Sequence, residues 1–250
     1  MLADEAFWEN YWKNVSGWQN VNIRNSYDRC FDRLFRRWLA PDRKSRLFEI
    51  GCAPGRWLIY FYQQFGYRVA GCDSAPQAVS VTRANLAQAG VPGEVILADF
   101  MANTVTAQAY DIVLSLGFIE HFEDPWPVIA RHAQLIKPGG KLVLEVPNYT
   151  GLNGWILKQS SHHYLDIHNT SVMRLAFFQE IAMRFDLVPR FIGLVGGPEP
   201  GLWDATGQRP LLLNLIRIAN RARQLMPFLD HVNHSFFSGY LVGIYQKGDY

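Results

Sequence analysis

The sequence has few cysteines, no long apolar run and no excess of charge of one sign. It holds three cysteines, Cys30, Cys52 and Cys72, an odd number without paired spacing. This excludes a disulfide framework and predicts free thiols in a reducing cytoplasm. No apolar stretch approaches the roughly 20 residues of a membrane span, and the first residues lack the regions of a secretory signal. We therefore expect a soluble, cytoplasmic protein without a transmembrane segment.

The charge balance also limits the partners. The formal net charge is +2, and the chain has no basic run that could follow a nucleic-acid backbone, so nucleic acid is not an expected partner. Aromatic residues, in contrast, make up 14% of the chain, and many of them lie near the N-terminus or in long connections. A small-molecule cavity walled by rings would explain this distribution, and so would a well-filled core.

Alternating strands and helices dominate the chain from residue 46 onward. Apolar runs and turn signals predict strands at 46–50, 68–72, 94–98, 111–115, 141–146, 187–194 and 239–246. Helices are predicted after the first, second and fourth strands, at 54–65, 76–89 and 125–136. A further helix, at 171–185, precedes the sixth strand. This pattern indicates a doubly wound α/β fold, a Rossmann-like and mostly parallel sheet with helices on both faces.

The rest of a single domain, 1–250, is expected to surround a cofactor-binding core at 45–147. Predicted helices at 3–14 and 27–39 have aromatic faces, and we interpret residues 1–44 as a helical cover outside the sheet layers. Residues 148–250 would supply substrate-side loops and helices and the last strands. They begin with a long loop that runs to residue 168.

The C-terminal part is expected to include an amphipathic helix at 209–225. Leu212, Leu215, Ile216 and Ala219 share one face of it, which predicts packing on the domain. The segment 197–235 that contains this helix could form a lid, a homodimer face or a peripheral membrane contact.

Small and acidic residues follow the first three predicted strands. Gly51, Ala53 and Gly55 follow the first predicted strand, which contains Glu49. Small residues at such a position let the chain turn sharply beside a ligand. A tight strand-to-helix turn would need the same residues. In open α/β sheets, ligands bind at the carboxyl ends of the parallel strands, which is where these residues are expected to lie.

The second and third strands each end in an acid. Asp73, with Ser74, follows the second strand and could accept ribose hydroxyls, although a helix N-cap would use the same residues. Asp99 and Phe100 follow the third, where a carboxylate and a ring suit an adenine; the alternative there is a surface turn. Because all three features occur at consecutive strand ends, we favour the nucleoside interpretation.

This series resembles the class I S-adenosylmethionine (SAM)-dependent methyltransferase family, over about residues 45–147. The stretch from Tyr110 to Ser115 matches the family's fourth strand, and Lys137-Pro138-Gly139-Gly140 matches its turn into the fifth. The resemblance implies that the cofactor is SAM and the product S-adenosylhomocysteine (SAH). The cofactor-binding residues that it implies are Glu49, Gly51, Gly55, Asp73, Ser74, Asp99, Phe100 and Ser115. Ala53 departs from the family, which has glycine there.

Two other functions share this architecture. An NAD(P)-dependent oxidoreductase usually needs a glycine where this chain has Arg56, for close packing beside a pyrophosphate; SAM has no phosphate, which favours methyl transfer. A non-catalytic partner subunit with the same fold would also bind SAM.

His121 is the first candidate for the chemistry, because it follows the fourth strand and has a pKa suited to a general base. The alternative is a histidine that packs beside the cofactor. Glu120-His121 is similar to a pair in the ubiquinone-biosynthesis O-methyltransferases, which bind a divalent metal there. A further Glu of that site is replaced by Gly117 here, so no metal is expected.

The loop after the fifth strand supplies the other candidates. His162, His163 and Tyr164 lie in a polar segment that ends at Asn169; we expect the histidines to assist proton removal and Tyr164 to contact substrate. Their spacing fits no standard metal site, and Asn169 could simply cap the next helix. Trp203 and Trp12 are further candidates for the substrate pocket. The function expected is methylation of a small-molecule acceptor at a hydroxyl of a natural product, sugar or glycan/lipid intermediate.

Overall fold

The structure is a computed structural model that describes residues 1–15, 19–102, 105, 107–160, 165–203 and 210–249. Its centre is a seven-stranded sheet in the order β3-β2-β1-β4-β5-β7-β6. Strand β7 is antiparallel to both of its neighbours, β5 and β6, and the other neighbouring strands pair in parallel. The strands are β1 (Arg46–Ile50), β2 (Arg68–Asp73), β3 (Glu94–Leu97), β4 (Tyr110–Leu116), β5 (Ile136–Pro147), β6 (Leu187–Pro198) and β7 (Ser238–Lys247). The predicted mostly parallel seven-stranded sheet is confirmed.

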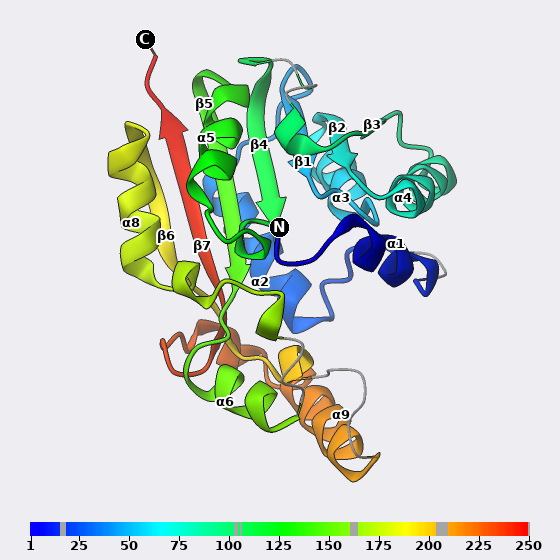
Figure 1. The fold of residues 1–250 in the computed structure, drawn as a ribbon, viewed down its shortest axis with the longest axis vertical. Helices are drawn as coiled ribbons and strands as arrows, with labels where there is room; N and C mark the ends of the chain where they lie inside the picture. Colours follow the sequence, from blue (N-terminus) through cyan, green and yellow to red (C-terminus); the bar gives the residue numbers. More distant parts are fainter. Residues whose placement is uncertain (16–18, 103–104, 106, 161–164, 204–209, 250) are drawn as a thin grey trace.

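Helices cover both faces of the sheet (Figure 1). The longer helices are α1 (Glu5–Lys13), α2 (Ser26–Trp38), α3 (Arg56–Phe65), α4 (Pro76–Ala89), α5 (Trp126–Leu135), α6 (Gly151–Ser160), α8 (Leu175–Arg184) and α9 (Pro210–Gln224). One core lies under α5 and α8, and a second lies under α2, α3 and α4. Short 3₁₀ turns are η1 (Phe100–Ala102), η2 (Ile119–His121), η3 (Thr170–Val172), η4 (Pro200–Trp203) and η5 (Pro227–His231).

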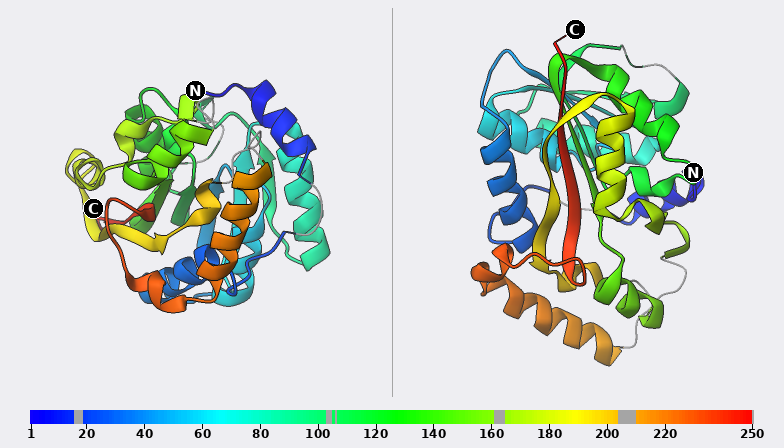
Figure 2. Two further views of the ribbon diagram at one scale, coloured as in Figure 1. Left: turned by 90° about the horizontal axis from the view of Figure 1, so that it is seen from below. Right: turned by 90° about the vertical axis from the view of Figure 1, so that its left-hand side faces the viewer.

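Helix α2 belongs to a sheet layer, so the prediction that it lies in a cover outside the layers is wrong. Phe31 and Phe35 are fully buried and share a core with Trp57 of α3 and with Val143 and Val242 of the sheet. Figure 2 shows α2 beside the sheet in the right-hand view. Of the two helices predicted in this cover, α1 lies outside the layers and has no buried residue. The aromatic face of α2 was visible in the sequence, but its partner lies far along the chain.

The C-terminal half differs from the sequence prediction in two further places. The expected loop after β5 contains α6, which packs against the segment before β7: Leu152 donates its N–H to the Phe236 carbonyl at 2.7 Å. In α9, Ile216 is buried as predicted, but Leu215, predicted on the same packed face, is 56% exposed. Leu212 lies where side chains are not described.

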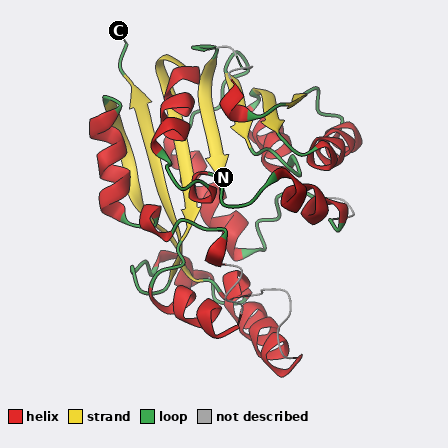
Figure 3. Cartoon of the chain, in the orientation of Figure 1, coloured by secondary structure: helices red, strands yellow, loops and turns green. Residues whose placement is uncertain are grey.

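All three cysteines are free, as predicted, and all three are buried. Within the described part of the chain, no helix combines the length and apolar character needed to cross a membrane. The carboxyl ends of the parallel strands meet at the lower edge of the sheet in Figure 1, and α6 and α9 extend beyond that edge (Figure 3). The predicted nucleoside-binding residues therefore all lie at one edge.

Candidate functional site

The turn after β1 needs glycine at two positions. Gly51 and Gly55 have φ angles of 66° and 86°, a region that other residues rarely adopt. A Cβ at Gly51 would lie 2.9 Å from Phe118 Cδ2. The turn is also tied to the tip of β2, because Gly51 donates its N–H to the Cys72 carbonyl at 2.9 Å. The turn after β1 thus has the backbone conformation that the predicted close approach to a ligand requires.

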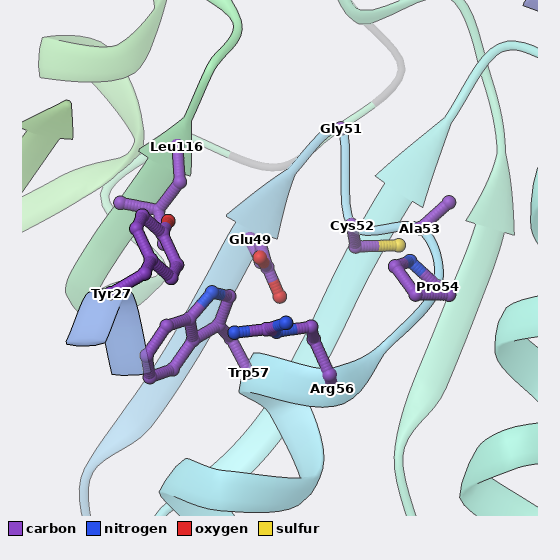
Figure 4. A pocket seen from close by; sticks show the side chains of 9 residues that line it. All are labelled: Tyr27, Glu49, Gly51, Cys52, Ala53, Pro54, Arg56, Trp57 and Leu116. Carbon is purple, nitrogen blue, oxygen red and sulfur yellow. The ribbon is translucent and has the colours of Figure 1, made fainter. Parts of the chain in front are cut away.

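A cavity of about 210 Å³ opens beside this turn, lined by Tyr27, Glu49, Gly51, Cys52, Ala53, Pro54, Arg56, Trp57 and Leu116. Figure 4 shows the side chains of Glu49 and Arg56 directed toward the same space, with the rings of Tyr27 and Trp57 on one side. The lining comes from α2, β1, α3 and β4. It therefore combines the predicted first motif with residues that the sequence analysis did not assign to a site.

Two polar atoms of this lining have no protein partner. Among the described residues, Glu49 Oε2 and Arg56 Nε are buried without a hydrogen bond. Burial, with the nearby charge of Asp73 as a second cause, raises the pKa of the Glu49 carboxyl well above its ordinary value. Arg56 forms an ion pair with Asp28, and its guanidinium lies 5.5 Å from the centre of the Tyr27 ring. Buried polar atoms are normally satisfied, so these two atoms are open to the polar groups of a ligand in the cavity.

Asp73 ends β2 close to the cavity. Its carboxylate accepts a hydrogen bond from the Ala75 N–H at 3.1 Å, so the helix-capping alternative describes part of its role. Burial raises its pKa from 3.8 to about 6. Ser74 beside it is half-buried. A carboxylate that is partly desolvated and still reachable is suited to accepting ligand hydroxyls.

The other predicted cofactor residues have more protein contacts. Asp99 is exposed and accepts from the Met101 N–H at 2.9 Å, as in the surface-turn alternative. Phe100 is buried, with its ring centre 4.9 Å from that of His132. His132 Nε2 in turn lies 3.0 Å from Ser115 Oγ. The roles of these three residues toward a cofactor remain predictions.

Two loops meet around His121. The imidazole Nδ1 lies 2.8 Å from the Ile167 carbonyl and therefore donates to it, which leaves Nε2 as the acceptor in the neutral ring. The Asn169 N–H donates to the Glu120 carbonyl at 2.6 Å. Trp8 of α1 contacts the imidazole edge-on, with the ring centres 4.8 Å apart. The loops after β4 and β5 and the N-terminal cover thus fix one orientation of this histidine.

Burial controls the charges here. It lowers the pKa of His121, against the opposing effect of the Ile167 bond, and raises the pKa of Glu120 to about 8. Glu145 on β5 is also buried, and its pKa is raised by burial and then by Glu120. Near neutral pH the imidazole is therefore unprotonated, with Nε2 able to accept a proton.

The same place holds a cluster of three ligand-type side chains. One donor atom from each of Glu120, His121 and His168 lies within 4.8 Å of the others, and all three residues are buried. His168 was not predicted to join them. These residue types can hold zinc or another divalent ion, whereas Gly117 offers no side chain. The expectation of no metal remains a prediction, tested below.

The remaining predicted site residues have different outcomes. His162, His163 and Tyr164 lie outside the described residues. Trp203 is half-buried and donates its indole N–H to Asn153 Oδ1 at 2.8 Å. Trp12 is half-buried and contacts Tyr11, with ring centres 5.1 Å apart. Asn169 caps η3 by accepting from the Ser171 N–H at 3.0 Å, as the capping alternative predicted.

Sequence analysis missed Arg56, Tyr27 and His168 as site residues. Arg56 directly follows the glycine turn, so its position was a usable signal, but the sequence suggested only that it does not suit a pyrophosphate. Tyr27 had no such signal, because it reaches the cavity only through the packing of α2. His168 was visible in the polar loop, without any indication that it would face Glu120 and His121.

Comparison with known families and proteins gives consistent results. The family described as "Methyltransferase domain" matches residues 22–188. Ubiquinone biosynthesis O-methyltransferase of Xanthomonas axonopodis pv. citri (strain 306) is 30% identical over 139 residues, 49% of this chain and 56% of that protein. The enzyme of the same name from Methylobacterium nodulans is 32% identical over 133 residues, 51% of each chain. This chain thus spans about half the length of the curated relatives it matches.

Solved structures share the fold at lower identity. A SAM-dependent methyltransferase from Archaeoglobus fulgidus has a TM-score of 0.56 at 17% identity, covering 87% of this chain and 93% of that one. Phosphoethanolamine N-methyltransferase 2 of Haemonchus contortus, in complex with SAM, has a TM-score of 0.59 at 16% identity, covering 89% of this chain and 53% of that one.

Proposed function

The chain belongs to the methyltransferase-domain family of SAM-dependent methyltransferases, and on that premise we propose that it methylates a hydroxyl group of a small-molecule acceptor. The observation that carries the proposal is His121, a buried imidazole whose Nδ1 is bound to the Ile167 carbonyl and whose Nε2 is left to accept a proton. The O-methyltransferase names of the curated relatives support the same chemistry.

The residues around the first turn fit SAM. The unpartnered Arg56 and Glu49 atoms would meet the carboxylate and ammonium of its methionine part, and Asp73 would accept the ribose hydroxyls. When bound, SAM supplies a methyl group on a sulfonium, a leaving group that needs little covalent assistance. The family and this fit leave no support for the oxidoreductase alternative, which requires a pyrophosphate site.

The chain's own part is to hold the acceptor, exclude water and take a proton. A neutral His121 would accept the hydroxyl proton as the oxygen becomes nucleophilic. The Ile167 carbonyl, 2.8 Å from Nδ1, would stabilise the imidazolium that results. Trp8 would close the site from the N-terminal side, because it lies against His121, and a closed site keeps water from competing with the acceptor.

The direct test is to incubate the protein with methyl-labelled SAM and matched acceptors that carry a phenol, a sugar hydroxyl or an amine. Labelled methyl ether together with SAH would support the proposal. Labelled N-methyl product alone would contradict methylation at oxygen. SAM binding without any methylated product from acceptors in all three classes would favour the non-catalytic alternative.

Asp73 gives a prediction about cofactor affinity. Changing Asp73 to alanine is expected to weaken SAH binding by about 1–3 kcal/mol, because ribose hydroxyls lose a charged acceptor. Since the pKa of Asp73 is about 6 and the ionised form binds, wild-type affinity should fall as the pH drops below that value, by up to about tenfold per pH unit.

Titration calorimetry with SAH between pH 5 and 8 checks both parts. Asp73→Asn should lose the acid-side dependence, while Asp99→Asn, which changes an exposed carboxylate, should keep it. Wild-type affinity that is independent of pH would remove Asp73 from the binding site.

Metal independence is a further prediction. We expect turnover to be unchanged after prolonged chelation with EDTA, because Gly117 offers no side chain as a further ligand beside Glu120, His121 and His168. Turnover is measured on the same preparation before chelation, after it and after adding back Zn²⁺ or Mg²⁺. Loss with EDTA and recovery with one ion would show that Glu120, His121 and His168 form a metal centre.

A further inference from the structure

The far end of the molecule, beyond the carboxyl edge of the sheet, has an unusual exposed surface. It is formed by α9, the segment that follows it and α6 (Figures 1 and 2). Its exposed apolar side chains include Leu215, Ile218, Leu225, Phe228, Val232 and Phe236. We call this surface the distal face. The most exposed of these side chains are Leu225 at 83%, Phe228 at 65% and Ile218 at 62%.

The helical spacing concentrates this character on one side of α9. Leu215 and Ile218 share the outer side of α9, as residues three apart do on a helix, and Leu225 follows directly after Gln224, the last residue of the helix. Ile216 and Arg223 lie on the inner side and are buried. The helix therefore presents an apolar stripe outward although it already buries its other side in the protein.

Cations flank this stripe, and acids are missing from it. Arg217 and Arg221 are both exposed on α9, and in the described part of the chain neither has an ion-pair partner. Residues 210–237 contain one acidic residue, Asp230, and its side chain is fully buried against Arg29, Arg33 and Arg223. The exposed side chains of residues 210–237 are thus apolar, basic or neutral polar, and none of them is acidic.

Helix α6 extends the same character. Its N-terminus is attached to the distal face through the hydrogen bond from Leu152 to Phe236. Trp155 on α6 is 62% exposed, Lys158 is exposed, and the sequence of α6 contains no acid. An indole and a lysine beside an apolar surface are the residues that favour the boundary between water and lipid headgroups.

We propose that the distal face binds an anionic phospholipid surface, with the apolar stripe entering the headgroup boundary and Arg217 and Arg221 pairing with lipid phosphates. Charge decides between this occupant and a second copy of the chain. A two-fold contact would place the same basic face against itself, and the arginines would meet no acid there. An anionic lipid surface supplies the missing negative charge over a wide area.

The test measures partition of the whole chain onto vesicles, without any activity assay. Vesicles of phosphatidylcholine alone are compared with vesicles that contain about three parts in ten of phosphatidylglycerol, within the range where basic segments respond to anionic lipid. We expect binding to the anionic vesicles that weakens as salt screens the charges. Because methyl transfer is not measured, failure here leaves the proposed function intact.

Two variants separate the two contributions. Arg217→Gln with Arg221→Gln should lower the partition coefficient about 30-fold, as expected for two surface cations. Leu225→Ser with Phe228→Ser should lower it at least about tenfold through lost apolar burial. Met183→Ser, which changes a side chain that is 77% exposed on α8, is the matched control and should bind as wild type.

Each contrary result overturns the proposal. Equal binding to both vesicle types, or equal loss in all three variants, would mean that the distal face does not recognise anionic lipid. Concentration-dependent dimerisation that the distal-face variants abolish, without vesicle binding by wild type, would instead assign the surface to a second copy. The substituted side chains are exposed, so each variant should retain the wild-type melting temperature.

Discussion

Replacing His121 by alanine is expected to slow methyl transfer by about 100- to 10,000-fold, the usual contribution of a general base, and to leave SAH affinity unchanged. The imidazole can take this role because burial lowers its pKa and the Ile167 carbonyl holds Nδ1. Single-turnover rates at saturating SAM measure the effect.

The pH profile distinguishes a base from a packing residue. Wild-type rate should fall on the acid side as His121 is protonated, below the ordinary histidine pKa of about 6.5, and remain level above it. In His121→Ala that acid limb should disappear, and the rate should rise toward alkaline pH as a phenolic acceptor ionises near its own pKa of about 10. Saturation with SAM keeps the titration of Asp73 out of this profile.

A second buried histidine provides the control. His132 is fully buried, with its Nδ1 on the Val128 carbonyl at 2.8 Å, and burial lowers its pKa to about 4. His132→Asn should reduce the melting temperature and retain the wild-type pH profile. If His121→Ala behaves in the same way as His132→Asn, His121 is a packing residue and the proposed proton transfer is wrong.

The parts of this site that follow from local sequence could be predicted. The tips of β1 and β2 were located because a short apolar run followed by small residues or an acid determines both the strand and its end. Gly51 and Gly55 need conformations that glycine alone adopts readily, and this need is visible in the sequence. The mostly parallel sheet with helices on both faces followed from the regular alternation of strands and helices.

The parts that were missed depend on residues far apart in the chain. Arg56 is held by Asp28, 28 positions away, and His121 is oriented by Ile167, 46 positions away. No periodicity in either segment indicates the other. Leu215 was predicted inside α9 because an apolar stripe normally marks the packed face. In α9 one apolar side is buried and another remains exposed, and the sequence alone does not show which is which.

Changing Asp230 to alanine should destabilise the protein by about 3–5 kcal/mol, the usual result of removing one partner from a buried ion pair. Its carboxylate lies 2.7 Å from Arg29 Nε of α2 and 2.7 Å from Arg223 Nη2 of α9. The side chains of Asp230 and Arg223 are almost completely buried, so Arg223 would retain an uncompensated charge. Urea unfolding followed by circular dichroism measures the difference.

The pH dependence follows from the same contacts. Burial works to raise the pKa of Asp230, but hydrogen bonds from Arg29 and Arg223 outweigh it and lower the pKa. A carboxyl with a lowered folded pKa stabilises the fold above its unfolded value, and the contribution is lost as the pH falls through the folded pKa. Wild type and Asp230→Ala should therefore differ fully at neutral pH and converge only in acid, below about pH 4.

Two comparisons make the Asp230 prediction specific. Asp111→Asn, at a partly exposed pair with Lys137, should cost below about 1 kcal/mol. Adding Arg223→Leu to Asp230→Ala should restore part of the lost stability, because it removes the uncompensated charge. A loss in Asp230→Ala no larger than that in Asp111→Asn would mean that the arginines find other partners.

The ion pairs of Asp230 with Arg29 and Arg223 are also expected to affect cofactor binding. The same α2 that carries Arg29 also carries Tyr27 in the cavity wall and Asp28 in the ion pair with Arg56. If Asp230 holds α2 in place, then folded Asp230→Ala, measured well below its melting temperature, should bind SAH more weakly than wild type. Calorimetry on the folded variant checks this, and wild-type affinity would show that the network acts on stability alone. Weakened binding would show that η5, which carries Asp230, affects the cavity through α2.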